Sequence, residues 1–147
     1  MNDINVYIEY SRIEDKTGGY AAILEVMVAD VPKTMEISER VCNVDRKRLE
    51  VLGLAAVLTH IKKPCNICLF TNGHYIYQTI ENEWLDKWET SGWTSSKGTE
   101  IQNADIWRQI KTLMMPHEII ASKEEHSYRN YLNYILRRQN EINITKN

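Results

Sequence analysis

The sequence lacks any hydrophobic run approaching the ~20 residues needed to cross a bilayer. Its first residues, Met1-Asn2-Asp3-Ile4, contain no basic segment followed by an apolar one, so we expect no secretory signal peptide. With only three cysteines, the chain cannot pair all of them internally. These absences favour a reduced, cytoplasmic protein with no membrane contact.

The chain also lacks a surplus of positive charge, since 18 Lys and Arg residues oppose 20 Asp and Glu residues and the net charge is -2. Non-specific nucleic-acid binders usually carry such a surplus, because released counterions supply most of their affinity. Any contact with a nucleic acid must therefore use local patches. The best patch comprises Arg46, Lys47, Arg48, Lys62 and Lys63. A helix face exposed to solvent explains these charges equally well.

The composition that remains is that of a globular protein. The 147 residues are 43% hydrophobic and 26% charged, which argues against disorder. We find no internal repeat and no linker long enough to separate two units, so residues 1–147 are expected to form a single domain.

Hydrophobic periodicity predicts five strands and several helices. Asp45 is placed to cap a helix that Pro64 stops, and Pro116 ends another. Polar turns are expected at residues 14–19 and at Val31-Pro32-Lys33. The predicted strands are residues 4–11, 20–28, 34–42, 65–71 and 118–122. The predicted helices are residues 46–61, 73–80 and 127–139, and a helix that begins at residue 103 or 105 and ends at 114. More helix is expected at residues 84–88, after the second of these. The order βββαβααβα indicates an α/β fold with one five-stranded mixed sheet and helices packed on it.

Five short segments in this order resemble ribonuclease H type 1, and the resemblance runs from about residue 4 to residue 140. The segments are Ser11–Leu24, Arg48-Leu49-Glu50, Phe70–Tyr75, the tryptophans Trp84, Trp88 and Trp93, and Asn103–Trp107. The resemblance implies a ribonuclease H-like fold and a metal-dependent activity that hydrolyses the RNA strand of RNA–DNA hybrids.

The implied chemistry depends on acidic side chains. Two Mg²⁺ ions ~4 Å apart stabilise the attacking and leaving oxygens. Two unit charges at that distance repel by about 4 kcal/mol at an effective dielectric of 20, and two divalent ions by four times as much. Carboxylate oxygens must offset this repulsion.

The four carboxylate positions of the family fall on Glu9, Glu50, Asn72 and Asn133 in this sequence. The family has Asp at the first, third and fourth of them, so the formal charge falls from -4 to -2. The resemblance therefore implies at most one weakly bound Mg²⁺ or Mn²⁺, held by Glu9 and Glu50.

The leading hypothesis is a catalytically defective domain that persists as a binding or assembly module. One alternative is a working nuclease that uses one metal or recruits Glu124, Glu125 or Asp45 to refill its site. Another is an inactive subunit that supports a catalytic partner.

Candidate binding residues lie around this site and on the segment that we call the handle, residues 81–100. The handle is acidic, carrying Glu81, Glu83, Asp86, Glu89 and Glu100 against Lys87 and Lys97, and would repel phosphates. We therefore expect a protein partner to dock on residues 84–100, with the tryptophans at least partly exposed, as the alternative to an RNA–DNA hybrid. The predicted binding residues are Arg46, Arg48, His74, Trp84, Trp88 and Trp93.

Two further signals have ordinary explanations. Cys65 and Cys68 have the spacing of half a zinc site, but residues three apart in a strand point to opposite faces, so we expect buried strand cysteines. The mobile histidine of the family falls near Lys123, and His126 is the nearest imidazole.

Overall fold

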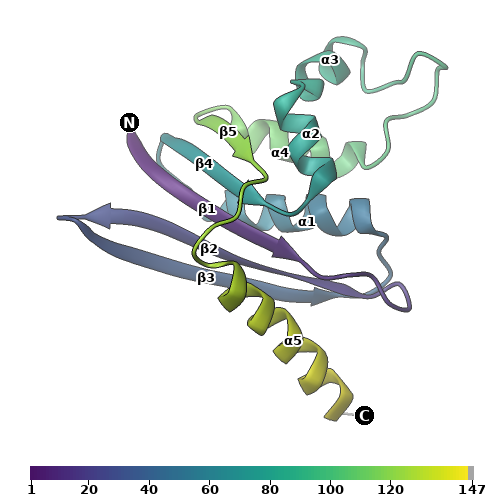
Figure 1. The fold of residues 1–147 in the computed structure, drawn as a ribbon. Helices are drawn as coiled ribbons and strands as arrows, with labels where there is room; N and C mark the ends of the chain where they lie inside the picture. Colours follow the sequence, from purple (N-terminus) through teal and green to yellow (C-terminus); the bar gives the residue numbers. More distant parts are fainter. Residues whose placement is uncertain (146–147) are drawn as a thin grey trace.

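The computed structural model describes the backbone of residues 1–145 and the side chains of residues 1–141 (Figure 1). Five strands form one mixed sheet in the order β3-β2-β1-β4-β5. The strands are β1 (Asn2–Tyr10), β2 (Gly18–Val28), β3 (Val31–Val41), β4 (Cys65–Thr71) and β5 (Glu118–Ser122). The helices are α1 (Arg46–Thr59), α2 (His74–Glu81), α3 (Trp84–Thr90), α4 (Ala104–Met114) and α5 (Arg129–Thr145).

This architecture confirms the predicted fold class and differs in two details. The helical stretch after β4 is divided into α2 and α3, because Glu83 adopts a positive φ of 54° between them. The turn between β2 and β3 lies at Ala29-Asp30, not at residues 31–33, which belong to β3. Both turn residues have positive φ, as a two-residue hairpin turn requires. Pro32 is tolerated because β3 lies at the edge of the sheet.

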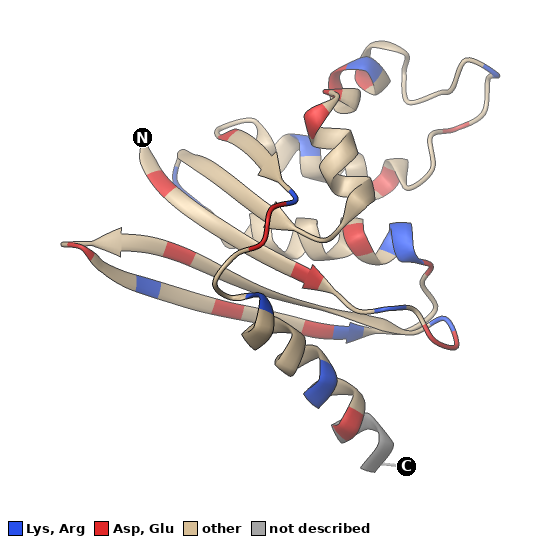
Figure 2. Cartoon of the chain, viewed as in Figure 1, with Lys and Arg blue, Asp and Glu red and all other residues tan. Residues whose placement is uncertain are grey.

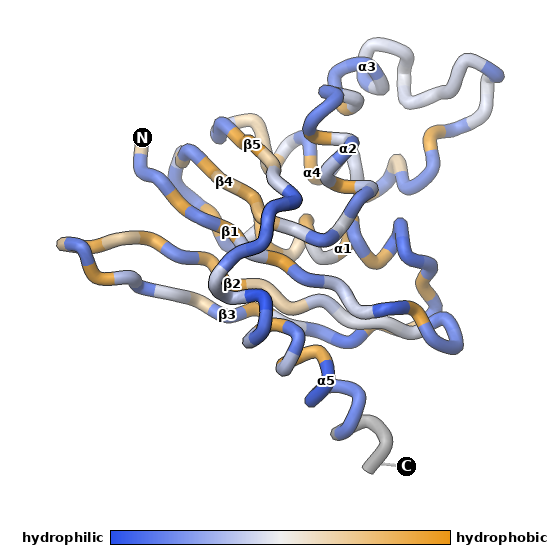
Figure 3. Tube along the Cα trace, in the orientation of Figure 1, coloured by the Kyte–Doolittle hydropathy of each residue, from blue (hydrophilic) through white to orange (hydrophobic). Residues whose placement is uncertain are grey.

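Helices lie on both faces of the sheet, α1 to α4 on one side and α5 alone on the other (Figure 1). Alternate residues of β1, namely Ile4, Val6, Ile8 and Tyr10, belong to the core cluster that also includes α1 and α4. Tyr7 points to the opposite face, where it packs with Leu132 and Leu136 of α5. Strand β4 is largely apolar and β1 alternates between hydrophobic and hydrophilic residues, whereas α5 is mostly hydrophilic (Figure 3). The larger core therefore lies on the α1 side of the sheet.

The start of α1 is fixed by a cap. The side chain of Asp45 accepts a hydrogen bond of 2.8 Å from the backbone amide of Arg48, as the sequence predicts. Since residues four apart lie on one helix face, this cap aligns Arg46 with Glu50.

In the described part of the chain, no helix has the length and apolar character needed to cross a membrane. Cys65 is buried in the core while Cys68 is half-buried, and both are free thiols, in line with strand cysteines. The cytoplasmic location stays a prediction.

Candidate functional site

Two buried glutamates mark the candidate site, where β1 ends and α1 begins. Glu9 is the penultimate residue of β1 and Glu50 lies on the second turn of α1, and each is only 2% exposed. Buried carboxylates are costly unless they are paired, so their partners decide what the site can do.

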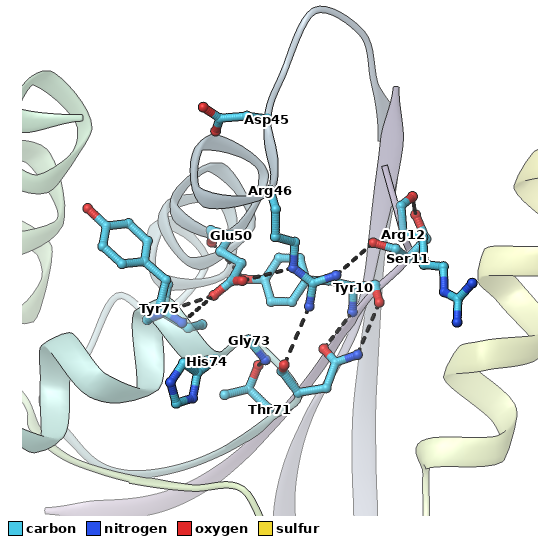
Figure 4. Close-up of polar contacts among 12 residues, drawn as sticks. Tyr10, Ser11, Arg12, Asp45, Arg46, Glu50, Thr71, Gly73, His74 and Tyr75 are labelled. Carbon is cyan, nitrogen blue, oxygen red and sulfur yellow. Dashed lines mark hydrogen bonds and ion pairs between the residues drawn. The ribbon is translucent and has the colours of Figure 1, made fainter. Parts of the chain in front are cut away.

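Both oxygens of Glu50 already have partners (Figure 4). Its Oε1 accepts hydrogen bonds from the backbone amides of Tyr75 (3.0 Å) and Ile76 (3.1 Å), at the start of α2. Its Oε2 accepts one of 2.8 Å from Nε of Arg46. The residue at the N-cap of α2 is Gly73, which has no side chain to offer. A Cβ there would lie 2.8 Å from Oε1 of Glu50, so glycine allows this close approach. Glu50 therefore caps α2 and neutralises Arg46.

The guanidinium group of Arg46 fills the space between α1, β1 and β4. Its Nη1 donates to the carbonyl oxygen of Ser11 at 2.8 Å, and its Nη2 donates to that of Asn72 at 3.4 Å. Its guanidinium carbon also lies 5.5 Å from the centre of the Tyr10 ring. Arg46 is thus held by four groups at the centre of the site.

The side chain of Asn72 is directed at the backbone of β1. Its Oδ1 accepts a hydrogen bond from the amide of Tyr10 (2.9 Å), and its Nδ2 donates to the carbonyl oxygen of the same residue (3.0 Å). The amide oxygen that could have served a metal therefore holds β1 against β4. The backbone amide of Asn72 donates to Oε2 of Glu9 at 3.1 Å.

Glu9 has a second arginine beside it. Nε of Arg129, the first residue of α5, lies 3.4 Å from Oε1 of Glu9. Burial raises the pKa of Glu9, whereas the charge of Arg129, the hydrogen bond from Asn72 and the charge of Arg46 act to lower it. The net effect is a raised pKa, so the arginines offset only part of the cost of burying this carboxylate.

His126 closes the other side of Glu9. Its Nδ1 accepts a hydrogen bond from the amide of Tyr128, which places the ring proton on Nε2. Nε2 is buried, lies 3.9 Å from Oε2 of Glu9 and has no hydrogen-bond partner among the described residues. Burial lowers the pKa of His126, and the charge of Arg129 lowers it further, so the imidazole is neutral at pH 7.

This arrangement does not fit two divalent cations. The formal charges of Glu9, Glu50, Arg46 and Arg129 sum to zero. Adding two divalent ions would bring the site to +4 without displacing either arginine. Within the described residues, no group of three or more His, Cys, Asp or Glu side chains is placed to hold a metal. Since both carboxylates are occupied by guanidinium groups, we derive no metal-dependent step from this geometry.

The sequence model of the RNase H family matches residues 1–125, which contain Glu9, Glu50 and Asn72 and end before α5. The chain belongs to the RNase H family. Its relatives include the ribonuclease H of Prosthecochloris aestuarii, which is 28% identical over 82% of this chain and 82% of that protein. The ribonuclease H of Cupriavidus necator is 31% identical over 81% of this chain and 79% of that protein. A match to the ribonuclease H of Nitratidesulfovibrio vulgaris spans only 63% of that protein.

Solved structures share the fold. The crystal structure of a type 1 RNase H with the type 2 active-site motif superposes with a TM-score of 0.72 at 16% identity, covering 91% of this chain and 70% of that chain. A foamy viral protease-reverse transcriptase in complex with dsDNA gives a TM-score of 0.69 at 14% identity, covering 90% of this chain and 88% of that chain. At such low identity, these likenesses establish the RNase H fold alone.

Asn133, the fourth predicted position of this RNase H domain, lines a different hollow from Glu9 and Asn72. Glu9 and Asn72 line one hollow together with Arg129, whereas Asn133 lines another hollow with Tyr10 and Arg12. Asn133 is one helical turn beyond Arg129, and one turn carries a side chain about 5.4 Å along the axis. The assignment of Asn133 to the same site as the other three positions stays a prediction, and Arg129 is the α5 residue whose guanidinium group lies 3.4 Å from Glu9.

The contacts of Arg46 and Arg129 with the two glutamates differ in how far the sequence predicts them. Arg46 was predicted to bind a partner, yet its position four residues before Glu50 is also that of an ion pair on one helix face. Arg129 was not predicted, because only the path of the chain between β5 and α5 brings it to Glu9.

Two other predicted binding residues of the RNase H domain have partners within the chain. His74, at the start of α2, receives a hydrogen bond of 2.9 Å through its Nδ1 from Nζ of Lys123. Arg48 forms a two-point ion pair with Asp105 of α4, with distances of 2.7 and 2.9 Å. The predicted basic patch at the start of α1 is therefore largely occupied by internal contacts.

The Arg48–Asp105 pair should make a small, pH-dependent contribution to stability. The hydrogen bond from Arg48 is the main cause that lowers the pKa of Asp105 below its ordinary value of 3.8. Since Asp105 is more acidic in the folded chain, the contribution is present above that value and disappears as the pH falls through the folded-state pKa. We expect Asp105→Asn to lower the free energy of unfolding by at most about 1 kcal/mol at pH 7, because the pair is largely exposed. Urea unfolding should show the difference between wild type and variant shrinking as the pH falls below 3.8, and a difference that stays undiminished at the lowest pH at which the protein folds would contradict this origin.

The tryptophans of the RNase H handle pack together more than the sequence indicates. Trp88 lies 5.9 Å from Trp84, 6.4 Å from Trp93 and 5.8 Å from Trp107, measured between ring centres. Trp93 and Trp107 are buried, whereas Trp84 and Trp88 are half-buried. The prediction of an exposed Trp93 is therefore wrong, because its ring belongs to the core cluster and is covered by the guanidinium group of Arg108.

Proposed function

We propose that this protein is a non-catalytic RNase H domain that binds its partner without cutting it. The observation that carries the proposal is the pairing of both buried glutamates with arginines. Arg46 donates to Glu50 at 2.8 Å, and Arg129 lies 3.4 Å from Glu9 and offsets part of the cost of its burial, so each carboxylate has a positive partner without a metal. The side chains of Asn72 and Asn133 add no charge to the site. The side-chain amide of Asn72 forms two hydrogen bonds with the backbone of Tyr10.

The names of the relatives favour a second candidate, a divalent-metal-dependent ribonuclease H with a divergent site. This candidate needs replacement carboxylates. Asp45 caps α1, and Glu125 forms an ion pair of 2.6 Å with Nη1 of Arg129. Glu124 lines the hollow beside Glu9 and is the remaining candidate ligand. A single Mg²⁺ or Mn²⁺ there would have to displace Arg129 from Glu9.

The partner belongs to one of two classes. A foamy viral protease-reverse transcriptase, of which this chain matches 19% with a TM-score of 0.56, has been solved in complex with an RNA/DNA hybrid, which supports hybrid binding by analogy. The acidic handle instead favours a protein partner on residues 84–100, for which Trp84 and Trp88 offer partly exposed rings. In either case the RNase H fold serves as a binding surface.

The test is to measure binding and cleavage in one sample. Fresh protein is incubated with an RNA–DNA hybrid in Mg²⁺ and separately in Mn²⁺, while the bound fraction and the cleaved fraction are followed together. We expect any hybrid that binds to remain intact. Metal-dependent product that accumulates over many turnovers would overturn the proposal in favour of the divergent nuclease.

A further inference from the structure

A second hollow lies beside the glutamate site and carries most of its charge on arginines. It has a volume of about 360 Å³ and is enclosed by the β1–β2 loop, the end of β3 and α5. Figure 2 shows basic residues on α5 and at the end of β3. Its charged and amide side chains are Arg12, Arg40, Arg137, Glu14, Asn133 and Asn140.

The three arginines of this hollow have no ion-pair partner among the described residues. This distinguishes them from Arg46, Arg48 and Arg129, each of which contacts a carboxylate. A single carboxylate, that of Glu14, lines the same hollow, so its formal charge is +2. The chain as a whole is slightly acidic, so this hollow is a local positive region that would attract an anion.

Arg40 provides an independent observation. Its Nε is buried and has no hydrogen-bond partner among the described residues. Arg40 stands opposite Gly19 in the pairing of β2 with β3, and its side chain lies on the α5 side of the sheet. A buried guanidinium N–H without an acceptor is costly, and such groups in native proteins usually meet an acceptor from a ligand or water.

We infer that this hollow is a binding site for a phosphate group. Guanidinium groups donate two parallel hydrogen bonds to a tetrahedral oxyanion, and three of them from separate elements can surround it. The amides of Asn133 and Asn140 add neutral donors at the same wall. This assigns Asn133 to phosphate binding, whereas the resemblance had matched it to the fourth carboxylate position of the family.

The phosphate can come from a nucleic-acid backbone or from a small phosphate compound. Tyr10 and Ser11 line the hollow and also contact Asn72 and Arg46, so the two sites adjoin. A nucleic-acid strand that occupied the hollow would therefore pass next to the glutamates. The inference does not depend on whether the protein cleaves that strand.

The test uses the full chain and two variants of neighbouring residues. Arg137→Gln removes one guanidinium group from the hollow, and Arg138→Gln removes the same charge from a residue that does not line it. One arm measures the affinity of a fluorescent RNA–DNA hybrid over a range of salt concentrations. The other arm measures the melting temperature in inorganic phosphate against chloride at equal ionic strength. Arg40→Gln is a further variant, read only if circular dichroism shows that it folds.

If the phosphate belongs to a nucleic acid, Arg137→Gln should weaken hybrid binding about tenfold, the effect of one charge-assisted hydrogen bond. The slope of log K against log salt should also become shallower by about 0.9, whereas Arg138→Gln should retain the wild-type affinity within about threefold. If the source is a small phosphate, phosphate should raise the melting temperature of wild type and Arg138→Gln but not of Arg137→Gln, with hybrid binding unchanged. Equal behaviour of the two variants in both arms would overturn the inference.

Discussion

We expect freshly prepared protein to cleave an RNA–DNA hybrid at least about a thousandfold more slowly than an RNase H with four carboxylates, in Mg²⁺ and in Mn²⁺ alike. The reason is electrostatic, because the metals of an intact site depend on a preorganised negative field. Here the formal charge of Glu9, Glu50, Arg46 and Arg129 is zero. A site with zero formal charge in place of -4 lacks the negative electrostatic field that binds the metal ions, whether or not substrate is present.

The assay needs an intact RNase H under identical conditions as its positive control. It also needs a mass measurement at Asn72, since an Asn-Gly sequence can deamidate and restore a carboxylate on storage. In the folded chain, the amide of Gly73 that would attack the side chain donates instead to Oγ1 of Thr71 at 2.9 Å. Turnover within about tenfold of the control by protein with an unmodified Asn72 would refute the prediction.

The second large effect concerns stability. We expect Glu50→Ala to lower the free energy of unfolding by about 3 kcal/mol, at the lower end of the range for breaking a buried ion pair because Arg46 reaches solvent. The substitution removes the acceptor of two α2 amides and leaves the guanidinium group of Arg46 without its carboxylate. Urea unfolding without added metal measures the loss, and Glu124→Ala, at an exposed residue, should stay within about 0.5 kcal/mol of wild type.

Glu50→Gln separates this role from that of a metal ligand. In a metal-free cluster of carboxylates, losing one negative charge relieves repulsion and stabilises the fold. In the site described here, the same change weakens the attraction to Arg46 while the side-chain oxygen can still accept from α2. We therefore expect Glu50→Gln to be less stable than wild type and more stable than Glu50→Ala. A stabilised Glu50→Gln would show that Glu50 belongs to an empty metal site.

Local patterns in the sequence predicted most of the fold. Strand alternation and breakers identified β4 and β5 with their observed limits, and Asp45 was correctly predicted as the cap of α1. The turn at Ala29-Asp30 was missed, because neither residue is a glycine or asparagine that would indicate positive φ. Local patterns work where the deciding interactions lie within a few residues.

The candidate site was predicted only in part. The grouping of Glu9, Glu50 and Asn72 follows from the resemblance to the family, whose sequence model covers these residues. The placement of Arg129 beside Glu9 depends on the rotation of α5 about its axis. Arg129 and Asn133 are four residues apart on one face of α5, and so are the apolar residues Leu132 and Leu136. The apolar pattern therefore does not tell which of the two polar residues lies beside Glu9. No short motif in the sequence determines that rotation.

The central claim is that arginines have taken the place of metal ions, and a calorimetric titration with Mn²⁺ tests it most directly. Mn²⁺ is chosen because it is a hard ion that carboxylates bind well. The titration compares wild type with the double variant Asn72→Asp, Arg129→Asp, which changes the formal site charge from zero to -3. We predict no saturable heat for wild type at millimolar Mn²⁺ and saturable binding for the double variant. Saturable binding to wild type with the affinity of the double variant would contradict the account.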